Sequence, residues 1–231
     1  MTNLIIPESV TEFGLFSFQN FTKLTNVTLP NCVTSIGTSA FEGCSKLNNI
    51  IIPERVALIR GATFRDCSSL TNIIIPEGVI SIGESAFDNC SSLTSVTIGN
   101  GVTSIGEKTF YDCDCLTSIT IPEGVTSIGL KAFGYCYSLE SITVDENNKN
   151  YSNDSYGVLF DKNKTKLIQY PIGNARTSYV IPEGAAVNGY AFSGCKNLEA
   201  VTLPGTMTSI YSDAFRDAVY RIRKENLTSA V

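Results

Sequence analysis

A repeat of 23 residues constrains this chain more than any other feature of its sequence. Leucine occurs at that interval from Leu24 to Leu139 without a slip, and phenylalanine keeps the same interval from Phe41 to Phe133. A unit of this length cannot bury its apolar side chains alone, so neighbouring units must stack and share one continuous core. The repeat therefore predicts a solenoid in which each unit forms one turn of the stack, or rung.

One unit, residues 116–138, shows what a rung should contain: LTSITIPEGVTSIGLKAFGYCYS. Ile119 and Ile121 alternate with Thr120, which is the pattern of a strand with one buried face. Pro122 follows and ends the strand, because proline cannot donate a ladder hydrogen bond. We therefore expect one short parallel β-strand in each rung.

The second half of the unit predicts the other sides of the rung. Residues 123–129, EGVTSIG, indicate a turn and a second short extended segment. Residues 130–136 place Phe133 and Cys136 at the spacing of one helical turn. A helical or 3₁₀ turn is therefore expected on the side away from the strand.

The repeat divides the chain into segments of one predicted solenoid domain, residues 1–231, in which residues 24–144 are regular. Residues 1–23 are predicted to form an aromatic N-terminal end rung, and residues 145–177 an irregular insert. The last repeats follow in residues 178–217, and residues 218–231 are predicted to form a basic, helix-compatible C-terminal cap or tail. Within the insert, residues 157–160 and 166–170 flank a polar stretch, which is typical of a β-hairpin. We expect this hairpin to stack into the solenoid.

Composition argues against several classes of function. Histidine is absent, which removes the usual general base and the commonest metal ligand. The formal charge of −5 disfavours nucleic acid, because phosphate binding requires clustered lysine and arginine. No apolar run is long enough to cross a bilayer, and the N-terminus lacks the pattern of an export signal. We therefore expect no enzyme activity, cofactor, bound metal, nucleic acid or membrane insertion.

Most cysteines occupy a single position of the repeat. The members of this column are Cys44, Cys67, Cys90, Cys113, Cys136 and Cys195. We interpret them as buried free thiols that pack as small apolar side chains. A disulfide ladder would need Cβ directions that rungs in register rarely provide, and a metal array lacks histidine and C-x-x-C spacing. Cys32 and Cys115 lie outside the column and are expected to be exposed, with their redox state open.

The outward positions of the strands should form a regular, weakly polar surface. The predicted partner-binding residues on it are Thr28, Ile51, Ile74, Thr97, Thr120 and Thr143, with Asn49 and Asn72. Ile51 and Ile74 are apolar interruptions, and adjacent exposed isoleucines can form a contact patch. Ordinary β-propensity is the alternative explanation for both. Arg55, Arg60 and Arg65 form a basic spot in one repeat, for which a solvated surface is the simplest explanation.

Two motifs resemble those of a known family. The sequence IPEGVTSIGxxAFxxC is similar to the repeat of the BspA-like leucine-rich repeat family, which occurs in bacteria and some mucosal protists. The insert resembles a recurrent element of the same family at Asn148, Tyr151, residues 157–160 and residues 165–171. Together the two motifs extend the resemblance over nearly the whole chain.

The resemblance implies a right-handed leucine-rich-repeat superhelix in a secreted or cell-surface protein. It also implies a non-catalytic module that binds a protein or glycan on host or other cells in adhesion, without catalytic residues to carry over. Two alternatives stay open: a spacer or oligomerisation segment of a larger surface protein, and a cytoplasmic scaffold or effector. The missing export signal and the many free thiols favour the cytoplasmic alternative. Neither the ligand nor the oligomeric state follows from the sequence.

Overall fold

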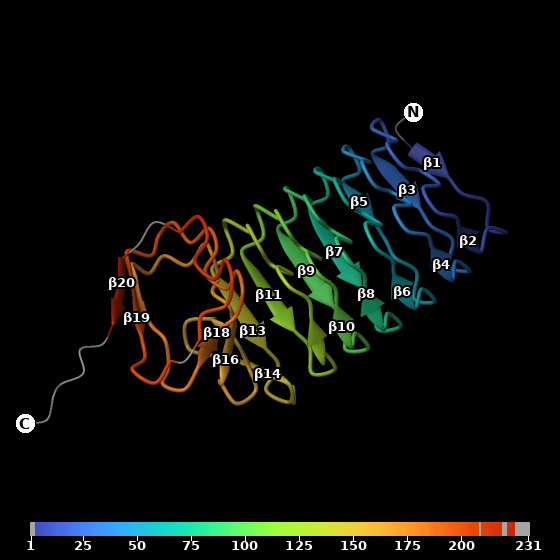
Figure 1. The fold of residues 1–231 in the computed structure, drawn as a ribbon. Helices are drawn as coiled ribbons and strands as arrows, with labels where there is room; N and C mark the ends of the chain where they lie inside the picture. Colours follow the sequence, from blue (N-terminus) through green and yellow to red (C-terminus); the bar gives the residue numbers. More distant parts are fainter. Residues whose placement is uncertain (1–2, 208, 219–220, 225–231) are drawn as a thin grey trace, which may run out of the picture.

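The computed structural model describes residues 3–207, 209–218 and 221–224. Along these residues the chain winds into an elongated stack of rungs, with the N-terminal rung at one end and β20 at the other (Figure 1). The regular elements are short β-strands joined by turns, and none of the described residues lies in a helix. The solenoid predicted from the repeat is confirmed.

The first strand of each regular rung lies on one side of the stack, which we call the strand face. The strands of this face form three short parallel sheets, in which neighbours pair through the same repeat position, as Asn3 does with Asn26 and Ser118 with Ser141. The strands of this face are β1 (Asn3–Ile5), β3 (Asn26–Thr28), β5 (Asn49–Ile50), β7 (Asn72–Ile75), β9 (Ser95–Ile98), β11 (Ser118–Ile121) and β13 (Ser141–Val144).

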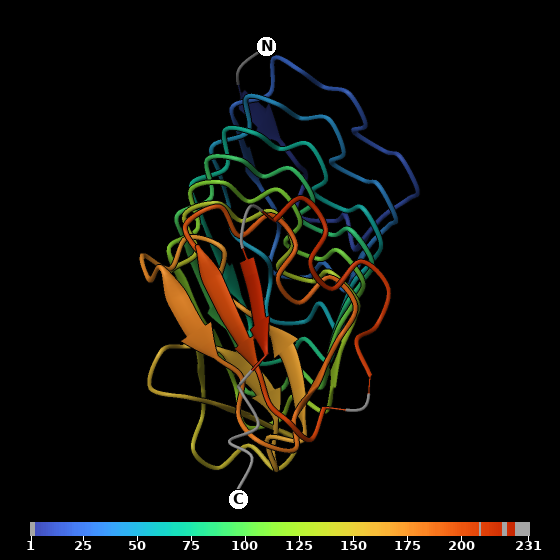
Figure 2. The same cartoon turned by 60° about the vertical axis from the view of Figure 1, so that its left-hand side comes forward.

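Two-residue strands form a second parallel sheet on another side of the core. They are β2 (Glu12–Phe13), β4 (Ser35–Ile36), β6 (Leu58–Ile59), β8 (Ser81–Ile82), β10 (Ser104–Ile105) and β12 (Ser127–Ile128), and they pair in chain order. The predicted second extended segment is therefore present in every regular rung. Viewed obliquely along the stack, the outlines of successive rungs follow one another closely (Figure 2).

The third side of each rung, which we call the turn side, is not helical as expected. In residues 37–45, the amides of Ser39, Phe41 and Gly43 donate to carbonyl oxygens of the following rung. The amides between them, such as that of Ala40, donate to the carbonyl three residues earlier. Ser39 and Gly43 also have positive φ, at 54° and 71°. In a helix every interior amide donates to a carbonyl of the same helix, whereas here alternate amides donate to the next rung. The spacing of the apolar residues therefore reflects a series of β-turns.

The core consists of columns in which each rung contributes the same residue type. In the regular rungs, the leucines of the column from Leu24 to Leu139, the phenylalanines from Phe41 to Phe133 and the cysteines from Cys44 to Cys136 are at most 3% exposed. The phenylalanine rings stack from Phe18 to Phe133, with neighbouring centroids 5.3–6.0 Å apart and nearly parallel planes. Each ring from Phe41 to Phe110 therefore contacts the rung before and the rung after, which couples neighbouring rungs.

The insert interrupts this stack with antiparallel strands. β15 (Leu159–Asp161) and β16 (Lys166–Gln169) form the predicted hairpin, and β16 then pairs in parallel with β18 (Ala186–Val187). A further strand, β14 (Tyr151–Asn153), pairs antiparallel with β15 and was not predicted. Side chains of the insert and of the rungs after it form a second core around Tyr170 and Phe192.

The last strands continue the strand pattern. β17 (Ser178–Val180), β19 (Ala200–Leu203) and β20 (Arg221–Lys224) form one parallel sheet. The expectation of a helix-compatible C-terminal segment is wrong for residues 221–224. These residues pair in parallel with Ala200–Leu203, with Ile222 opposite Val201, so the segment is a strand. Residues 219–220 and 225–231 of the predicted cap lie outside the described residues.

Candidate functional site

The predicted partner-binding residues all lie exposed along the strand face. Ile51 and Ile74 are 73% and 68% exposed, whereas the alternate residues Ile50 and Ile73 are buried in the core. Thr28, Asn49, Asn72, Thr97, Thr120 and Thr143 are also exposed. The strand alternation therefore places the predicted residues on one surface, as period-2 patterning requires.

A further member of the same column was missed in the sequence. Ile5 pairs with Thr28 in the register of β1 and β3 and is 90% exposed. The sequence does not predict this role for Ile5, because residues 1–23 are expected to form an atypical end rung, although the spacing from Ile5 to Ile51 is two repeats. The apolar column of the strand face thus includes Ile5, Ile51 and Ile74, with Thr28 between the first two.

The second sheet also carries exposed apolar side chains, but fewer. Leu58 is 41% exposed and Ile80, next to β8, is 52% exposed. Around them, threonine hydroxyls such as that of Thr103 donate to the backbone of the preceding rung. These two residues belong to the same rungs as Ile51 and Ile74, which makes them a matched reference for the strand face.

A polar hollow on the turn side was not foreseen from the sequence. It has a volume of about 410 Å³ and spans four successive rungs. Its charged lining consists of Arg65, Lys108 and Lys131 with Asp66, Asp88 and Asp112. Of the three arginines in the predicted basic spot, only Arg65 contributes to it.

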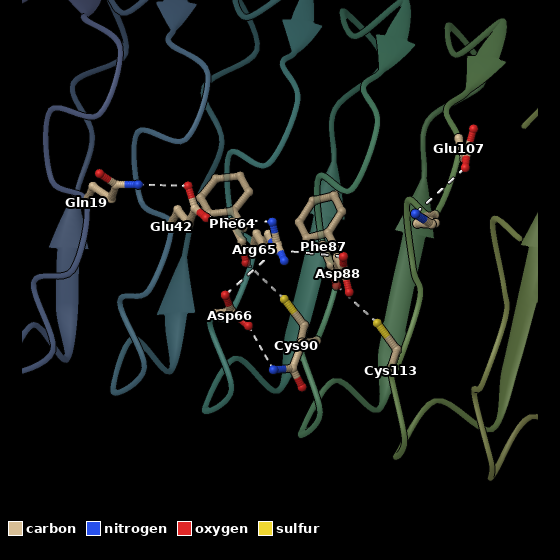
Figure 3. Close-up of polar contacts among 12 residues, drawn as sticks. Gln19, Glu42, Phe64, Arg65, Asp66, Phe87, Asp88, Cys90, Glu107 and Cys113 are labelled. Atoms are coloured by element: carbon tan, nitrogen blue, oxygen red, sulfur yellow. Dashed lines mark hydrogen bonds and ion pairs between the residues drawn. The ribbon is translucent and has the colours of Figure 1, made fainter.

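Arg65 is the centre of the ion pairs at one end of this turn-side hollow. Its Nε lies 3.8 Å from Oδ2 of Asp66 and 3.8 Å from Oδ2 of Asp88, and its Nη1 lies 4.0 Å from Oε1 of Glu42 (Figure 3). Asn89 donates to Oδ1 of Asp66 at 2.8 Å. Side chains from three consecutive turns therefore meet here, because the repeat places them one above the other.

Burial shifts the titration of several groups in the hollow. Burial raises the pKa of Asp88 above its ordinary value, and Arg65 partly offsets this effect. Burial, followed by the charges of Asp114 and Asp88, raises the pKa of Asp112. Burial and the nearby Asp112 raise the pKa of Tyr111 to about 12, so its hydroxyl stays protonated at neutral pH.

The cysteine column is a structural feature of the core. Each regular thiol donates to the carbonyl of the phenylalanine in the preceding rung, as Cys90 Sγ does to Phe64 at 3.2 Å. Burial raises the pKa of Cys44 to about 11 and that of Cys67 well above its usual value. The thiols of Cys44 and Cys67 therefore stay protonated and unreactive at neutral pH.

The two cysteines outside the column differ from each other. Cys115 is exposed as expected, whereas Cys32 is only half-buried and its Sγ donates to the carbonyl of Glu8 at 2.9 Å. Across the described residues no cluster of three or more potential metal ligands occurs. A search of the same residues finds no helix with the length and apolarity needed to cross a bilayer.

The columns of the core match a known repeat. The BspA type leucine-rich repeat region matches the chain in six copies, over residues 1–113, 59–171 and 173–231. The chain belongs to the BspA-type leucine-rich repeat family. Leucine-rich repeat regions are in general binding or scaffold modules, and the fold of this family fits a module that binds proteins.

Solved structures of bacterial leucine-rich repeat proteins share this fold. A leucine-rich cell surface protein from Faecalibacterium prausnitzii is 35% identical, with a TM-score of 0.82 over 96% of this chain and 62% of that one. The pneumococcal vaccine antigen PcpA is 26% identical, with a TM-score of 0.85 over 96% of this chain and 60% of that one. This member of the BspA-type family therefore spans less than two thirds of either structure. No curated protein matches it.

Proposed function

We propose that this BspA-type chain is a non-catalytic recognition module of a bacterial surface protein, and that its strand face binds a protein in adhesion to another cell. The exposed column of Ile5, Ile51 and Ile74 carries this proposal. Interfaces need an apolar centre that is sealed from water and a polar rim around it. The isoleucines supply the centre, and the threonine and asparagine columns supply the rim.

The shape of the strand face supports a broad contact. Its strands are about 4.8 Å apart, so the stretch from Ile5 to Ile74 extends over roughly 14 Å. Two of the flanking asparagines are already hydrogen-bonded to each other, since Asn26 Nδ2 donates to Asn3 Oδ1 at 3.4 Å. Side chains that are held before binding lose less conformational entropy when a partner binds.

The similar structures support a location at the cell surface. The Faecalibacterium protein is described as a cell surface protein, and PcpA is described as a vaccine antigen. We extend that location to this chain, in preference to the cytoplasmic alternative.

Binding of the purified chain to arrayed extracellular matrix proteins tests the proposal. The variant Ile51→Lys with Ile74→Lys is expected to lose binding, because it places two charges in the apolar centre. The control is Leu58→Lys with Ile80→Lys, which makes the same change in the same rungs on the second sheet and should retain binding. Equal loss in both variants would remove the strand face from consideration. Absence of binding by the unmodified chain would favour a spacer.

A further inference from the structure

The turn-side hollow lies apart from the strand face. Its lining comes from the turns after the second sheet, so a partner on the strand face leaves it open. Its volume of about 410 Å³ lies within the range of small-molecule sites. The lining extends over four rungs from Arg65 to Lys131, which corresponds to roughly 14 Å at about 4.8 Å per rung.

The charges of the hollow favour a neutral ligand. Three basic and three acidic side chains line it, so their formal charges cancel. A positively or negatively charged ligand in the hollow would be repelled by three of these side chains and attracted by the other three. The Arg65 pairs are also long, at 3.8–4.0 Å, which leaves the guanidinium with hydrogen-bonding capacity for another acceptor.

One wall of the hollow is aromatic. Tyr111 lines it, and its ring packs edge-on against Tyr135 at a centroid distance of 5.1 Å. Tyr135 in turn packs edge-on against Tyr137, and its hydroxyl donates to Asp217 Oδ2 at 3.0 Å. The Tyr111 ring is therefore held in place. An ordered ring face suits the apolar C–H face of a sugar ring, which carries slight positive charge.

Asp112 supplies an acceptor beside this ring. The described residues contain no ion pair that involves Asp112, although its carboxyl is half-buried. A carboxylate can accept hydrogen bonds from two neighbouring hydroxyls at once. Asp114 lies two residues away, is exposed and does not line the hollow.

We propose that the turn-side hollow binds a short stretch of a neutral glycan, roughly two or three sugar rings long. Tyr111 packs against the apolar face of one sugar, and Asp112 accepts hydrogen bonds from two of its hydroxyls. Arg65 and Asn89 donate to hydroxyls of the next sugar towards the N-terminal end. This site adds a second specificity to the module and does not depend on the strand face.

Calorimetric titration with neutral and charged oligosaccharides tests this site. The neutral probes are maltotriose, cellotriose and mannotriose, and the charged probes are sialyllactose and a heparin tetrasaccharide. A neutral probe is expected to bind, and Asp112→Ala should weaken it by about tenfold or more, the effect of losing a charged hydrogen bond. Asp114→Ala, the same change outside the hollow, should leave the affinity within about twofold.

Three results would overturn the proposal. The first is no binding of any neutral probe at about 10 mM, a concentration that reveals even weak sites. The second is a preference for the charged probes, and the third is an equal effect of Asp112→Ala and Asp114→Ala. The variant with Ile51→Lys and Ile74→Lys should still bind the neutral probe. Its retained sugar binding separates this site from the strand face.

Discussion

The insert begins at the same repeat positions as the regular rungs, but it fills them with polar side chains where the regular rungs have apolar ones. The buried valine column runs from Val33 to Val125, and its next member, 23 residues later, is Asn148. Asn148 is also fully buried, but its Nδ2 donates to the carbonyls of Pro122 and Val125, at 2.7 and 3.1 Å. Its Oδ1 accepts two further hydrogen bonds from backbone amides of the insert. The insert thus begins in phase and changes only the chemistry.

Tyr151 follows the same rule three residues later. It takes the position of the isoleucine column that ends at Ile128, and its hydroxyl accepts the Ile128 amide at 3.0 Å. In the regular rungs, a parallel strand of the next rung provides hydrogen-bond partners for the backbone, as β12 does for β10. A repeat thus spreads its stability over many equal contacts, whereas the interruption depends on a few polar side chains that replace missing backbone partners.

Truncation of the phenylalanine ladder should have the largest effect. Phe110→Ala is expected to lower the free energy of unfolding by about 3–5 kcal/mol, because the cavity removes ring contacts with both adjacent rungs. Urea denaturation followed by circular dichroism measures this loss. The control is Phe16→Ala, whose ring is 54% exposed and which should cost less than about 1 kcal/mol. A loss below about 1 kcal/mol for Phe110→Ala would contradict the role of the ladder.

Restoration of the repeat inside the insert should destabilise the protein. Asn148→Val supplies the residue of the regular rungs but leaves buried carbonyl and amide groups without partners, at an expected cost of about 2–3 kcal/mol. Asn147→Val, at the exposed neighbouring position, should change stability by less than about 0.5 kcal/mol. A neutral or stabilising Asn148→Val in the same denaturation experiment would show that the insert follows the rules of the regular rungs.

The regular rungs were predictable because one physical requirement recurs in each of them. Every rung must bury the same positions against its neighbours, so leucine, phenylalanine and cysteine mark the core without reference to the structure. The turn side was misjudged for a specific reason. The i, i+3 spacing of Phe133 and Cys136 fits both a helical turn and a chain of β-turns, and only the hydrogen bonds between rungs distinguish them.

The hollow could not be predicted because its residues keep the positions of the repeat but do not keep one residue type at each position. Arg65, Asp88 and Tyr111 occupy one repeat position, yet they differ in charge and size. The repeat stacks these residues, but whether their side chains leave a hollow between them depends on their rotamers, which sequence spacing does not give. The strand face was easier to anticipate, since alternation alone decides which side chains point outward.

The regular rungs contact their neighbours more closely at one glycine position than the N-terminal rung does. A Cβ on Gly106 would lie 2.7 Å from backbone atoms of the preceding rung, whereas a Cβ on Gly14 meets nothing within 4 Å. Gly106→Ala is therefore expected to cost about 2 kcal/mol, because the rungs must separate to accept it. Gly14→Ala occupies the same repeat position and should be neutral or slightly stabilising. Thermal denaturation of the two variants measures the difference, and equal melting temperatures would contradict tight rung stacking.

Asp154 and Asp112 extend the comparison to single carboxylates. In the insert, Asp154 Oδ1 accepts the amides of Tyr156 and Val158, and Oδ2 accepts the Tyr179 hydroxyl at 2.7 Å. Asp154→Asn exchanges one acceptor for a donor and should lower the free energy of unfolding by about 1 kcal/mol at neutral pH. Asp112, in a regular rung, accepts no comparable set of hydrogen bonds from the described residues. Replacing its carboxylate should therefore raise the free energy of unfolding instead of lowering it.

Asp112→Asn should raise stability slightly at neutral pH, by less than about 1 kcal/mol because the side chain is partly exposed and screened. Burial raises the pKa of Asp112 in the folded state, so folding favours its protonated form and the carboxylate opposes folding at high pH. The gain from the amide should therefore shrink as the pH falls below the ordinary range of aspartate. Denaturation at pH 7 and at pH 3 checks this sign, and a gain that grows on acidification would contradict it. If Asp112 both lowers stability and binds a sugar, then the regular rungs resemble the insert in one respect. In both, a residue that makes a specific polar contact replaces one that would stabilise the stack more.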